Sequence, residues 1–248
     1  MKPLAIDLFC GLGGWTEGLL AEGYDVVGYD IEAHVYGEKR YPAQLVLQDV
    51  LTLHGRQFKD AALIVASPPC QAYSYMAMPW KLAKAKAKAI RDDTTGESLV
   101  RLNRLFNACF RIQAEASLAA GRHIPLVIEN VRGAQPWVGR SRGNFGSFHL
   151  WGDVPALMPM ATSRHTGIKA PGMNWSDPTK RGQDFTRLAG QHAVNQENGT
   201  KIGGDWFSDP KSTCRRHGSK SKGRKMASAM IAKIPLSLSR HIAAAYRP

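Results

Sequence analysis

The sequence predicts an α/β protein built on a doubly wound, mainly parallel sheet, and two observations lead to that prediction. First, short apolar runs alternate with stretches of helical periodicity through the first half of the chain, which is typical of repeated strand–helix units. Second, glycine, proline or acidic residues follow the apolar runs, as expected where buried strands end in turns. In such sheets, ligands bind at the carboxyl ends of the strands. We therefore expect the chemistry of this 248-residue chain at that edge.

The individual elements follow from the same patterns. Strands are predicted at residues 4–9, 24–30, 45–49, 62–66 and 124–130, with weaker strand patterns at 147–150 and 185–188. Helices are predicted at residues 16–22, 33–41, 97–120 and 226–246, the last interrupted by Pro235. Between residues 132 and 225 the periodicity is lost, and Gly, Pro, Ser, Asn and Trp are frequent. An irregular segment therefore separates the sheet from the last helix.

Composition is typical of a globular protein in a reducing compartment. Hydrophobic residues make up 44% and charged residues 21%, which is too apolar for a disordered chain. No apolar run has the length of a transmembrane helix, and Asp7 comes too early for a secretory signal. The four cysteines form no CxxC pair, and Cys214 and His217 have no second ligand pair at a suitable spacing. We expect a cytoplasmic protein without a metal ion or membrane attachment.

The positive charge is concentrated in the last part of the chain. The 33 Lys and Arg residues against 20 Asp and Glu give a net charge of +13. Residues 1–139 carry a net +1, residues 140–226 a net +9 and residues 227–248 a net +3. This asymmetry indicates a polyanionic partner, most simply nucleic acid. The alternative is a basic, soluble surface with no partner.

The first motif, Asp7-Leu-Phe-Cys-Gly-Leu-Gly-Gly14, is a strand that runs into a glycine turn and a helix. Its glycines allow the backbone to approach a nucleotide-like ligand closely. The spacing is not GxGxxG and no P-loop lysine follows, which disfavours a pyrophosphate. Asp30 and Asp49 end the next two strands, where they suit ribose hydroxyls and an adenine amino group. Alternatively, the motif is an ordinary tight turn and both acids are solvated.

Two further motifs place reactive groups at the same edge. Two prolines stiffen the turn before Cys70 in Ser67-Pro-Pro-Cys-Gln-Ala-Tyr-Ser74, after the fourth strand. A thiolate is the strongest side-chain nucleophile. Glu129 lies near the end of the fifth strand and is an acid partner for such a thiol. Taken singly, each also has a structural interpretation, as a buried inert thiol and a salt-bridged strand-end acid.

In this order and at these spacings, the three motifs resemble those of the DNA cytosine-5 methyltransferase family. The family patterns DLFxGxGG, PCQxxS and ENV match residues 7–14, 69–74 and 129–131. The resemblance covers roughly residues 4–133 and, more weakly, the C-terminal helix, in a chain as short as compact phage and prophage members. It implies a Rossmann-like S-adenosylmethionine-dependent methyltransferase fold with a small irregular target-recognition insertion. Residues 1–133 and 227–248 would form the catalytic domain, and residues 134–226 the basic target-recognition region.

The resemblance also implies a reaction: methyl transfer from S-adenosylmethionine to C5 of a cytosine flipped out of double-stranded DNA. Cys70 would attack C6, and Glu129 would hydrogen-bond or protonate N3 during that attack. Arg140 and Arg142 are the candidates for the family's RxR pair, which contacts the flipped base, although they follow ENV unusually soon. The four expected catalytic residues are Cys70, Glu129, Arg140 and Arg142.

For the cofactor, the resemblance implies that Phe9 stacks near the adenine and that Gly11 and Gly13 approach the methionine part. Asp30 and Asp49 would hold the ribose and adenine. The full expected set is Asp7, Phe9, Gly11, Gly13, Gly14, Asp30, Ile31, Asp49, Val50 and Pro68. Two departures concern this pocket: Asp30-Ile31 stands where the family usually has Glu and a bulky residue, and Ile231–Pro235 lacks the family's late GN motif.

The expected nucleic-acid contacts lie in the turn after the cysteine and in two basic runs. The run Lys81–Arg91 falls where the family has a mobile loop that closes over DNA, and the run Lys211–Lys225 is rich in Gly and Ser. The alternatives are a solvated, partly helical lysine loop and a disordered segment. The expected residues are Gln71, Ser74, Lys84, Lys86, Lys88, Arg215, Arg216, Lys220 and Lys222. No protein partner is indicated, so a monomer is expected.

Two other functions remain open. An RNA (tRNA) cytosine-5 methyltransferase would carry the same motifs, and the basic insertion does not distinguish it from a DNA enzyme. A catalytically silent DNA-binding relative is the second alternative. Cys70 and Glu129 argue against a silent relative, whereas the altered last motif argues slightly for it.

Overall fold

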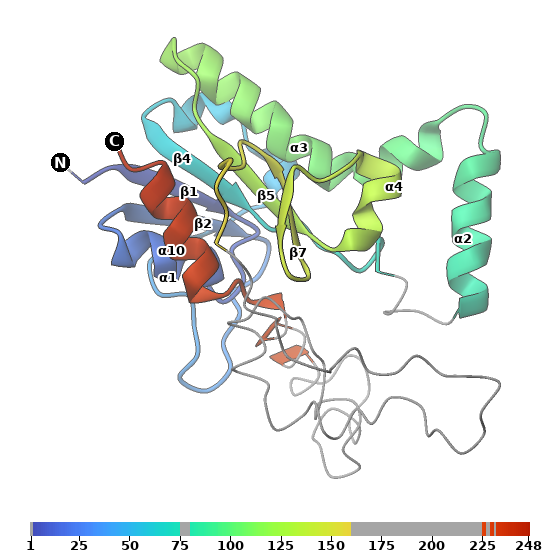
Figure 1. Cartoon of the computed structure of the whole chain (residues 1–248), viewed down its shortest axis with the longest axis horizontal. Helices are drawn as coiled ribbons and strands as arrows, with labels where there is room; N and C mark the ends of the chain where they lie inside the picture. Colours follow the sequence, from blue (N-terminus) through green and yellow to red (C-terminus); the bar gives the residue numbers. More distant parts are fainter. Residues whose placement is uncertain (1, 75–79, 160–224, 227–228, 231) are drawn as a thin grey trace.

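A seven-stranded mixed sheet forms the centre of the protein. In the computed structural model, the described residues are 2–74, 80–159, 225–226, 229–230 and 232–248 (Figure 1). The strand order is β3-β2-β1-β4-β5-β7-β6. The strands are β1 (Leu4–Leu8), β2 (Asp25–Asp30), β3 (Gln44–Leu47), β4 (Ala61–Ala66), β5 (Leu126–Asn130), β6 (Gly143–Phe145) and β7 (Phe148–Gly152).

The sheet has a parallel part and an antiparallel edge. Strands β3, β2, β1, β4 and β5 pair in parallel, whereas β7 pairs antiparallel with both β5 and β6. The order 3-2-1-4-5 is that of doubly wound nucleotide-binding sheets. The expected α/β class and the Rossmann-like, doubly wound arrangement of the parallel strands are therefore confirmed.

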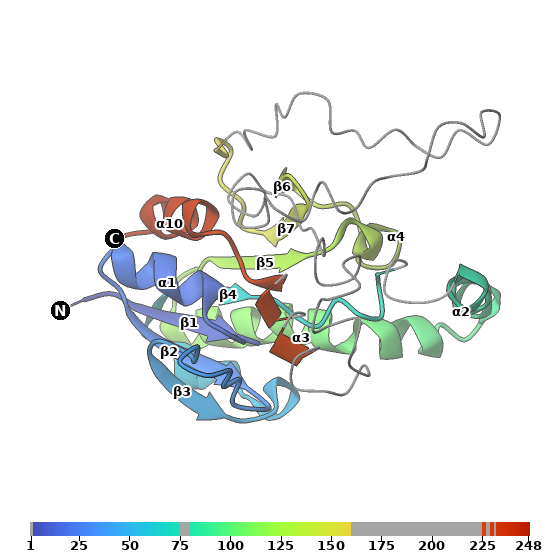
Figure 2. The ribbon, with the colours of Figure 1, turned by 90° about the horizontal axis from the view of Figure 1, so that it is seen from below.

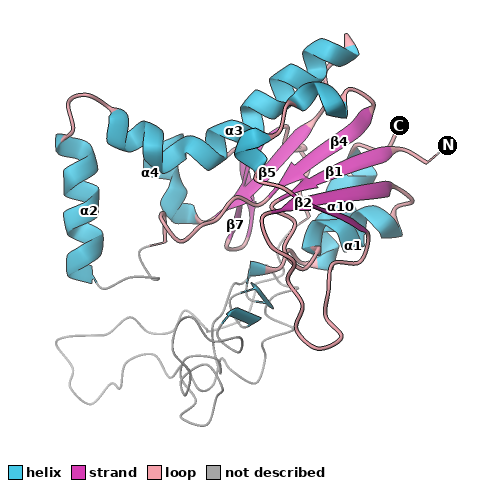
Figure 3. Cartoon of the chain, turned by 180° about the vertical axis from the view of Figure 1, so that it is seen from behind, coloured by secondary structure: helices cyan, strands magenta, loops and turns pink. Residues whose placement is uncertain are grey.

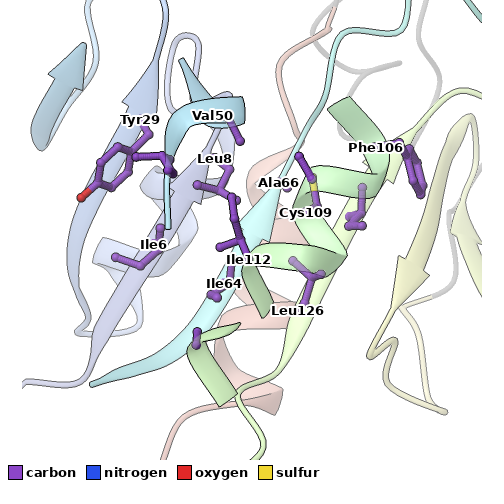
Figure 4. Close-up of a cluster of buried hydrophobic side chains, with 14 of the residues drawn as sticks. Ile6, Leu8, Tyr29, Val50, Ile64, Ala66, Phe106, Cys109, Ile112 and Leu126 are labelled. Atoms are coloured by element: carbon purple, nitrogen blue, oxygen red, sulfur yellow. The ribbon is translucent and has the colours of Figure 1, made fainter. Parts of the chain in front are cut away.

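Helices cover both faces of the sheet. Helices α1 (Gly14–Ala21) and α10 (Leu236–Ala245) lie side by side on one face, and α3 (Glu97–Ala120) lies on the other (Figure 2). Each face has its own apolar core, because successive strand residues point to opposite faces. Phe106, Cys109 and Ile112 of α3 pack on Ile6, Leu8, Ile64, Ala66 and Leu126 (Figure 4). Trp15 and Leu19 of α1 pack with Leu238 and Ile242 of α10 on the other face.

Most predicted elements are confirmed with small shifts at their ends. The helix predicted at residues 97–120 is α3, and Pro235 stands immediately before α10 as its N-cap. Strand β1 stops one residue earlier than predicted because Phe9 has a left-handed φ of 58°. The strand pattern at 147–150 corresponds to β7, and that at 185–188 lies outside the described residues.

The helix predicted at residues 33–41 is wrong. This segment forms a tight turn in which the backbones of Tyr36 and Lys39 exchange hydrogen bonds of 2.9 and 3.2 Å. Gly37 at the turn has φ = 65°, which a right-handed helix does not contain. Tyr41 is 7% exposed, and its hydroxyl reaches Thr16 in the interior. The segment therefore folds back over the sheet edge instead of continuing as a helix.

Two further segments contain more regular structure than the sequence predicted: the run Lys81–Arg91 and the residues directly after 133. The run Lys81–Arg91 is helical: it forms most of α2 (Trp80–Asp92), which lies away from the sheet beyond the start of α3 (Figure 3). After β5, the short helices η4 (Arg132–Ala134) and α4 (Gln135–Val138) lead into β6 and β7. The sheet therefore continues past the boundary expected at residue 133. Most of the expected target-recognition region, residues 160–224, lies outside the described residues.

Candidate active site

The glycine turn after β1 has an unusual backbone. Phe9, Gly11 and Gly13 have φ values of 58°, 52° and 76°, all in the left-handed region. A Cβ on Gly13 would lie 2.5 Å from Cδ of Pro42, so both the conformation and the packing require glycine there. A Cβ on Gly11 would meet no atom within 4 Å. Open space therefore lies over the backbone at Gly11.

Asp30 connects this turn to the end of β2. Its Oδ2 accepts a hydrogen bond of 2.9 Å from the Gly11 N–H, and its Oδ1 accepts one of 2.7 Å from the Ile31 N–H. His34 Nε2 lies 3.7 Å from Oδ1. Burial raises the pKa of Asp30, but hydrogen bonds from His34 and from the Gly11 and Glu32 N–H groups outweigh burial and hold the pKa below its ordinary value. Asp30 is therefore a carboxylate at neutral pH that holds the glycine turn in place.

Asp7 lies beneath the turn and is fully buried. Its Oδ2 accepts a hydrogen bond of 2.7 Å from the Thr16 hydroxyl, whose oxygen is 2.7 Å from the Tyr41 hydroxyl. Because Thr16 donates its single proton to Asp7, Tyr41 must donate to Thr16. Oδ1 of Asp7 has no partner among the described residues. Burial raises the pKa of Asp7 to about 7. Asp7 therefore keeps its proton up to about neutral pH, and it bonds to the helix that follows the turn.

The turn that carries Cys70 is attached to both neighbouring strands. On the β1 side, Ser67 N–H donates to the Leu8 carbonyl at 3.1 Å. The indole N–H of Trp15 donates to the Ser67 hydroxyl at 3.0 Å. On the β5 side, the Asn130 amide donates to the Pro68 carbonyl at 2.9 Å. Cys70 itself is half-buried, so its thiol stands at the sheet edge on a turn held from both sides.

Glu129 is a buried acid at the β5 end of this edge. It is 4% exposed and lies on β5, immediately before Asn130. Because Asn130 bonds to Pro68, two residues before Cys70, Glu129 and Cys70 belong to adjoining strand ends. The ends of β2, β1, β4 and β5 thus form one continuous hydrogen-bonded edge, which contains the expected nucleophile and the expected acid.

Arg140 and Arg142 lie beyond β7, on the side of β5 that is away from β4. Both side chains are exposed, and Ser141 between them is held by Gln135 Oε1 at 3.2 Å. The Arg142 N–H donates to the carbonyl of Leu150 at 2.9 Å, and Leu150 is the residue opposite Glu129 in the sheet. Two strand spacings, about 10 Å, therefore separate the backbone of Glu129 from the segment that carries the arginines. The structure brings these arginines to the β5 side of the edge.

The remaining expected cofactor residues differ in accessibility. Ile31 is 76% exposed and Asp49 is exposed, with Asp49 Oδ1 accepting from the Leu51 N–H. Val50 is 2% exposed in the core, and a Cβ on Gly14 would lie 2.4 Å from the backbone nitrogen of Ile234. Val50 and Gly14 therefore pack against the protein itself. Two more expected residues, Phe9 and Pro68, are half-buried and buried.

The expected nucleic-acid residues are only partly described. Gln71 is exposed and Ser74 is half-buried, with the Ser74 N–H bonded to the Cys70 carbonyl at 3.0 Å. On α2, the exposed Lys81, Lys84 and Lys88 fall at helical positions i, i+3 and i+7 and so share one face, with Lys88 paired to Asp92. The exposed Lys86 points elsewhere. Four further expected residues lie outside the described part of the chain: Arg215, Arg216, Lys220 and Lys222.

Sequence reasoning missed several residues that hold this edge. The amide of Asn130 joins β5 to the Cys70 turn, and Trp15 joins α1 to Ser67. Asn130 was within reach, because a carboxamide beside a strand-end acid can bond the neighbouring strand end. Trp15 and Tyr41 carry no such signal, since their partners lie 52 and 25 residues away in sequence.

Neither a metal site nor a membrane span is found in the described part of the chain. No group of three or more His, Cys, Asp or Glu side chains there could hold a metal ion. None of the helices described is long and apolar enough to cross a bilayer.

Residues 4–112 match the family described as C-5 cytosine-specific DNA methylase. The matched region contains the glycine turn and the Cys70 turn and ends before Glu129. The resemblance inferred from the motifs is therefore confirmed for this part of the chain. No curated protein matches the chain significantly.

The chain is also similar, at low identity, to solved methyltransferase structures. One is an Escherichia coli prophage protein assigned as a DNA modification methyltransferase, with 23% identity, TM-score 0.35, and coverage of 54% of this chain and 33% of that one. The Entamoeba histolytica methyltransferase EhMeth has 17% identity, TM-score 0.35, and coverage of 56% and 41%. The Schizosaccharomyces pombe Dnmt2 methyltransferase has 17% identity, TM-score 0.34, and coverage of 56% and 37%. The chain thus matches 33–41% of the length of these proteins, and at this level of similarity they do not bear on its activity.

Proposed function

We propose that this chain is an S-adenosylmethionine-dependent cytosine-5 methyltransferase that acts on double-stranded DNA. The family match over residues 4–112 gives the class of reaction. The observation that carries the proposal is the continuous edge in which the Cys70 turn bonds to β1 on one side and β5 on the other. This arrangement supplies a nucleophile and an acid in adjoining strand ends, as attack on a pyrimidine ring requires.

The residues at the β1 and β2 ends fit S-adenosylmethionine. The open space over Gly11 leaves room for a ligand close to the backbone. Asp30 beside it uses Oδ2 for the Gly11 N–H, and a carboxylate oxygen can accept a second hydrogen bond, which suits a ribose hydroxyl. Asp49, Ile31 and Phe9 are accessible enough to contact an adenine. When bound, S-adenosylmethionine supplies an electrophilic methyl group to C5 of the base.

Cys70 prepares the cytosine for that transfer. Its thiol loses a proton to solvent, the sulfur forms a bond to C6, and the C5–C6 double-bond electrons become available at C5. Glu129 donates a hydrogen bond or proton to N3 as the ring gains electrons, and Arg140 and Arg142 bind the base. After methylation, water or hydroxide removes the C5 proton, the C5–C6 double bond re-forms, the sulfur leaves C6 as a thiolate, and N3 returns to Glu129 any proton that it took. Cys70 and Glu129 are thus restored for another cycle.

The DNA would be held by basic groups outside the sheet edge. The target base must leave the duplex because C6 is inaccessible within a base stack. The DNA strand that carries this base is proposed to contact two groups of residues. These are Lys84, Lys86 and Lys88 on α2, and Gln71 and Ser74 beside the nucleophile. Four residues of the second basic run are proposed as phosphate contacts: Arg215, Arg216, Lys220 and Lys222.

We also retain the proposed division of labour along the chain. Residues 1–133 and 227–248 would carry catalysis, and residues 134–226 would recognise the target sequence. Within the second group, β6 and β7 complete the sheet beside Glu129. This part of the recognition region would therefore also position the base.

A methyl-transfer assay tests the proposal. The purified chain is incubated with S-adenosylmethionine labelled in its methyl group and, separately, with mixed-sequence duplex DNA or tRNA. We expect label in 5-methylcytosine of the duplex only, abolished in Cys70→Ala. Transfer to tRNA alone would identify an RNA enzyme. No transfer to either substrate, with S-adenosylmethionine binding absent by calorimetry, would identify a catalytically silent relative.

A further inference from the structure

Asn103 is a buried carboxamide on a helix face that is otherwise apolar. It is 6% exposed, whereas Phe106, Cys109 and Ile112 on the same side of α3 belong to the core. A buried amide costs stability unless both of its ends are bonded. Both ends of Asn103 are bonded: Oδ1 accepts from the Tyr73 hydroxyl at 3.0 Å, and Nδ2 donates to the Trp137 carbonyl at 2.7 Å.

The bond from Tyr73 leads directly to the nucleophile. Tyr73 is 3% exposed, lies three residues after Cys70, and its N–H donates to the Cys70 carbonyl at 3.0 Å. Burial raises the pKa of Tyr73 to about 12, so its hydroxyl keeps the proton that it donates to Asn103 Oδ1. The same hydroxyl also lies 3.2 Å from the Leu102 carbonyl. Through this hydroxyl, the turn that carries Cys70 is attached to α3.

The bond to Trp137 leads to the segment that carries Arg140 and Arg142, and to helix α2. Trp137 lies in α4, which ends two residues before Arg140. Its ring lies under the guanidinium of Arg91 at the end of α2, 5.9 Å from the ring centroid. Asn103 thus sits where three segments meet, each carrying groups that the proposed function assigns to the base or to the DNA.

We propose that Asn103, acting through Tyr73 and Trp137, is a positioning residue that sets the Cys70 turn relative to the Arg140–Arg142 segment. The inference rests on the proposed function. A purely structural role would be served as well by an apolar side chain, which fits the α3 core without the cost of burying an amide. Displacement of a reacting group by about 1 Å costs up to about 100-fold in rate, so the two bonds have a measurable kinetic signature.

Two substitutions break the two bonds separately. Tyr73→Phe removes only the hydroxyl and leaves the ring in the core. Asn103→Asp keeps an acceptor for Tyr73 but turns an acceptor toward the Trp137 carbonyl. Gln113→Leu is the matched control, because Gln113 is also a carboxamide of α3 but bonds to Ile124 and Asp153, at the other end of β5.

The experiment measures how fast a duplex containing 5-fluorocytosine becomes covalently attached to Cys70. We expect both variants to slow attachment between about 10-fold and about 100-fold, with S-adenosylmethionine affinity unchanged and Gln113→Leu at the wild-type rate. Equal rates in wild type and Tyr73→Phe would overturn the proposal. Tyr73→Phe also decides the matter if Asn103→Asp fails to fold.

The result separates this inference from the proposed function. If the wild type forms no adduct with DNA, the proposed function fails, and the positioning role is then read from alkylation of Cys70 by iodoacetamide, followed by peptide mass mapping. A positioned turn predicts that Tyr73→Phe changes the rate and pH profile of that alkylation, whereas Gln113→Leu does not. Unchanged alkylation of Cys70 in Tyr73→Phe would overturn the positioning role independently.

Discussion

The side-chain amide of Asn130 donates a 2.9 Å hydrogen bond to the carbonyl of Pro68, and this bond joins the strand that carries Glu129 to the turn that carries Cys70. Its Oδ1 accepts from the Val131 N–H at 2.8 Å, so both ends of the 1%-exposed amide are bonded. The Asn130 amide thus links the strand end of the proposed acid to the turn of the proposed nucleophile.

Asn130→Asp tests this relationship. The substitution keeps the acceptor for Val131 but places a second acceptor against the Pro68 carbonyl. We expect unfolding in urea to show a loss of about 1–3 kcal/mol, the cost of a buried polar group without its partner. We also expect a lower turnover number with unchanged S-adenosylmethionine affinity. Wild-type turnover in a folded Asn130→Asp would show that the two strand ends need no such link.

Glu129→Gln tests the acid. The amide keeps the shape of the side chain but cannot give a proton to N3 of cytosine. Turnover should fall by about 10²–10⁴-fold, the usual contribution of general acid catalysis. Glu97→Gln, the same change at an exposed position at the start of α3, is the control and should leave turnover unaltered. A fall of less than tenfold for Glu129→Gln would move the role to Arg140 or Arg142.

The fold was largely predictable, because strand ends leave marks in the sequence. The runs before Gly11, Asp30 and Pro68 became β1, β2 and β4 at the expected edge. The absence of a helix at residues 33–41 was not predictable, because it depends on the left-handed conformation of Gly37 and on the contact between the Tyr41 hydroxyl and Thr16. Both the Gly37 conformation and the Tyr41 contact depend on tertiary packing, which a local sequence pattern does not report.

The candidate site divides in the same way. Cys70, Asp30 and Glu129 stand at or directly after strand ends, and that placement made them candidates. The residues that hold them were not found, because Tyr73 meets Asn103 only after α3 has packed on the sheet, 30 residues along the chain. Sequence patterns therefore locate reactive groups at the ends of strands. They do not locate the hydrogen bonds between distant elements that hold those groups in place.

The lysines of helix α2 give a prediction about the salt dependence of DNA binding. Replacing Lys84, Lys86 and Lys88 with Ala should flatten the plot of log affinity for duplex DNA against log salt by up to about 2–3, at about 0.9 per lost phosphate contact. Because Lys88 also pairs with Asp92, its share should be the smallest. Arg56→Ala with Lys59→Ala is the control: both side chains are exposed and precede β4, at the opposite end of that strand from Cys70. An unchanged slope in the triple variant would make α2 a solvated helix without a DNA contact.

The second basic run can be examined in the same titration. Replacing Arg215, Arg216, Lys220 and Lys222 with Ala should also flatten the salt dependence and should weaken all duplex sequences about equally, as phosphate contacts do. S-adenosylmethionine binding is the internal control and should not change. Loss of affinity for one sequence only would instead assign these residues to base recognition.

Asp7 gives a prediction about pH. Its pKa is about 7 in the folded protein against an ordinary value of 3.8, so the folded state holds the proton more tightly than the unfolded chain. The contribution of Asp7 to stability is therefore full below about pH 4 and falls as pH rises to 7, by roughly 1.4 kcal/mol per pH unit at most. Among the groups that face it, burial raises the pKa of Cys10 and of Tyr41 well above neutrality, and Asp30 remains ionised.

Asp7→Asn should remove this dependence. Oδ1 of Asn can accept the Thr16 hydroxyl as Asp7 Oδ2 does, and the amide is neutral at every pH. The free energy of unfolding, followed in urea at pH 5 and pH 8, should decline less between the two values in the variant than in the wild type, and the variant should be the more stable at pH 8. The same decline in both proteins would mean that Asp7 titrates normally.

The account depends most on the bond between Cys70 and the target base, and mass spectrometry of a trapped complex measures that bond directly. Wild-type protein is incubated with S-adenosylmethionine and a duplex whose cytosines are replaced by 5-fluorocytosine, because fluorine cannot leave C5 as a proton does. The account predicts a methylated covalent protein–DNA complex that maps to the peptide containing Cys70 and is absent in Cys70→Ala. Adduct at another residue, or an unmodified Cys70 in a protein that methylates duplex DNA, would contradict it.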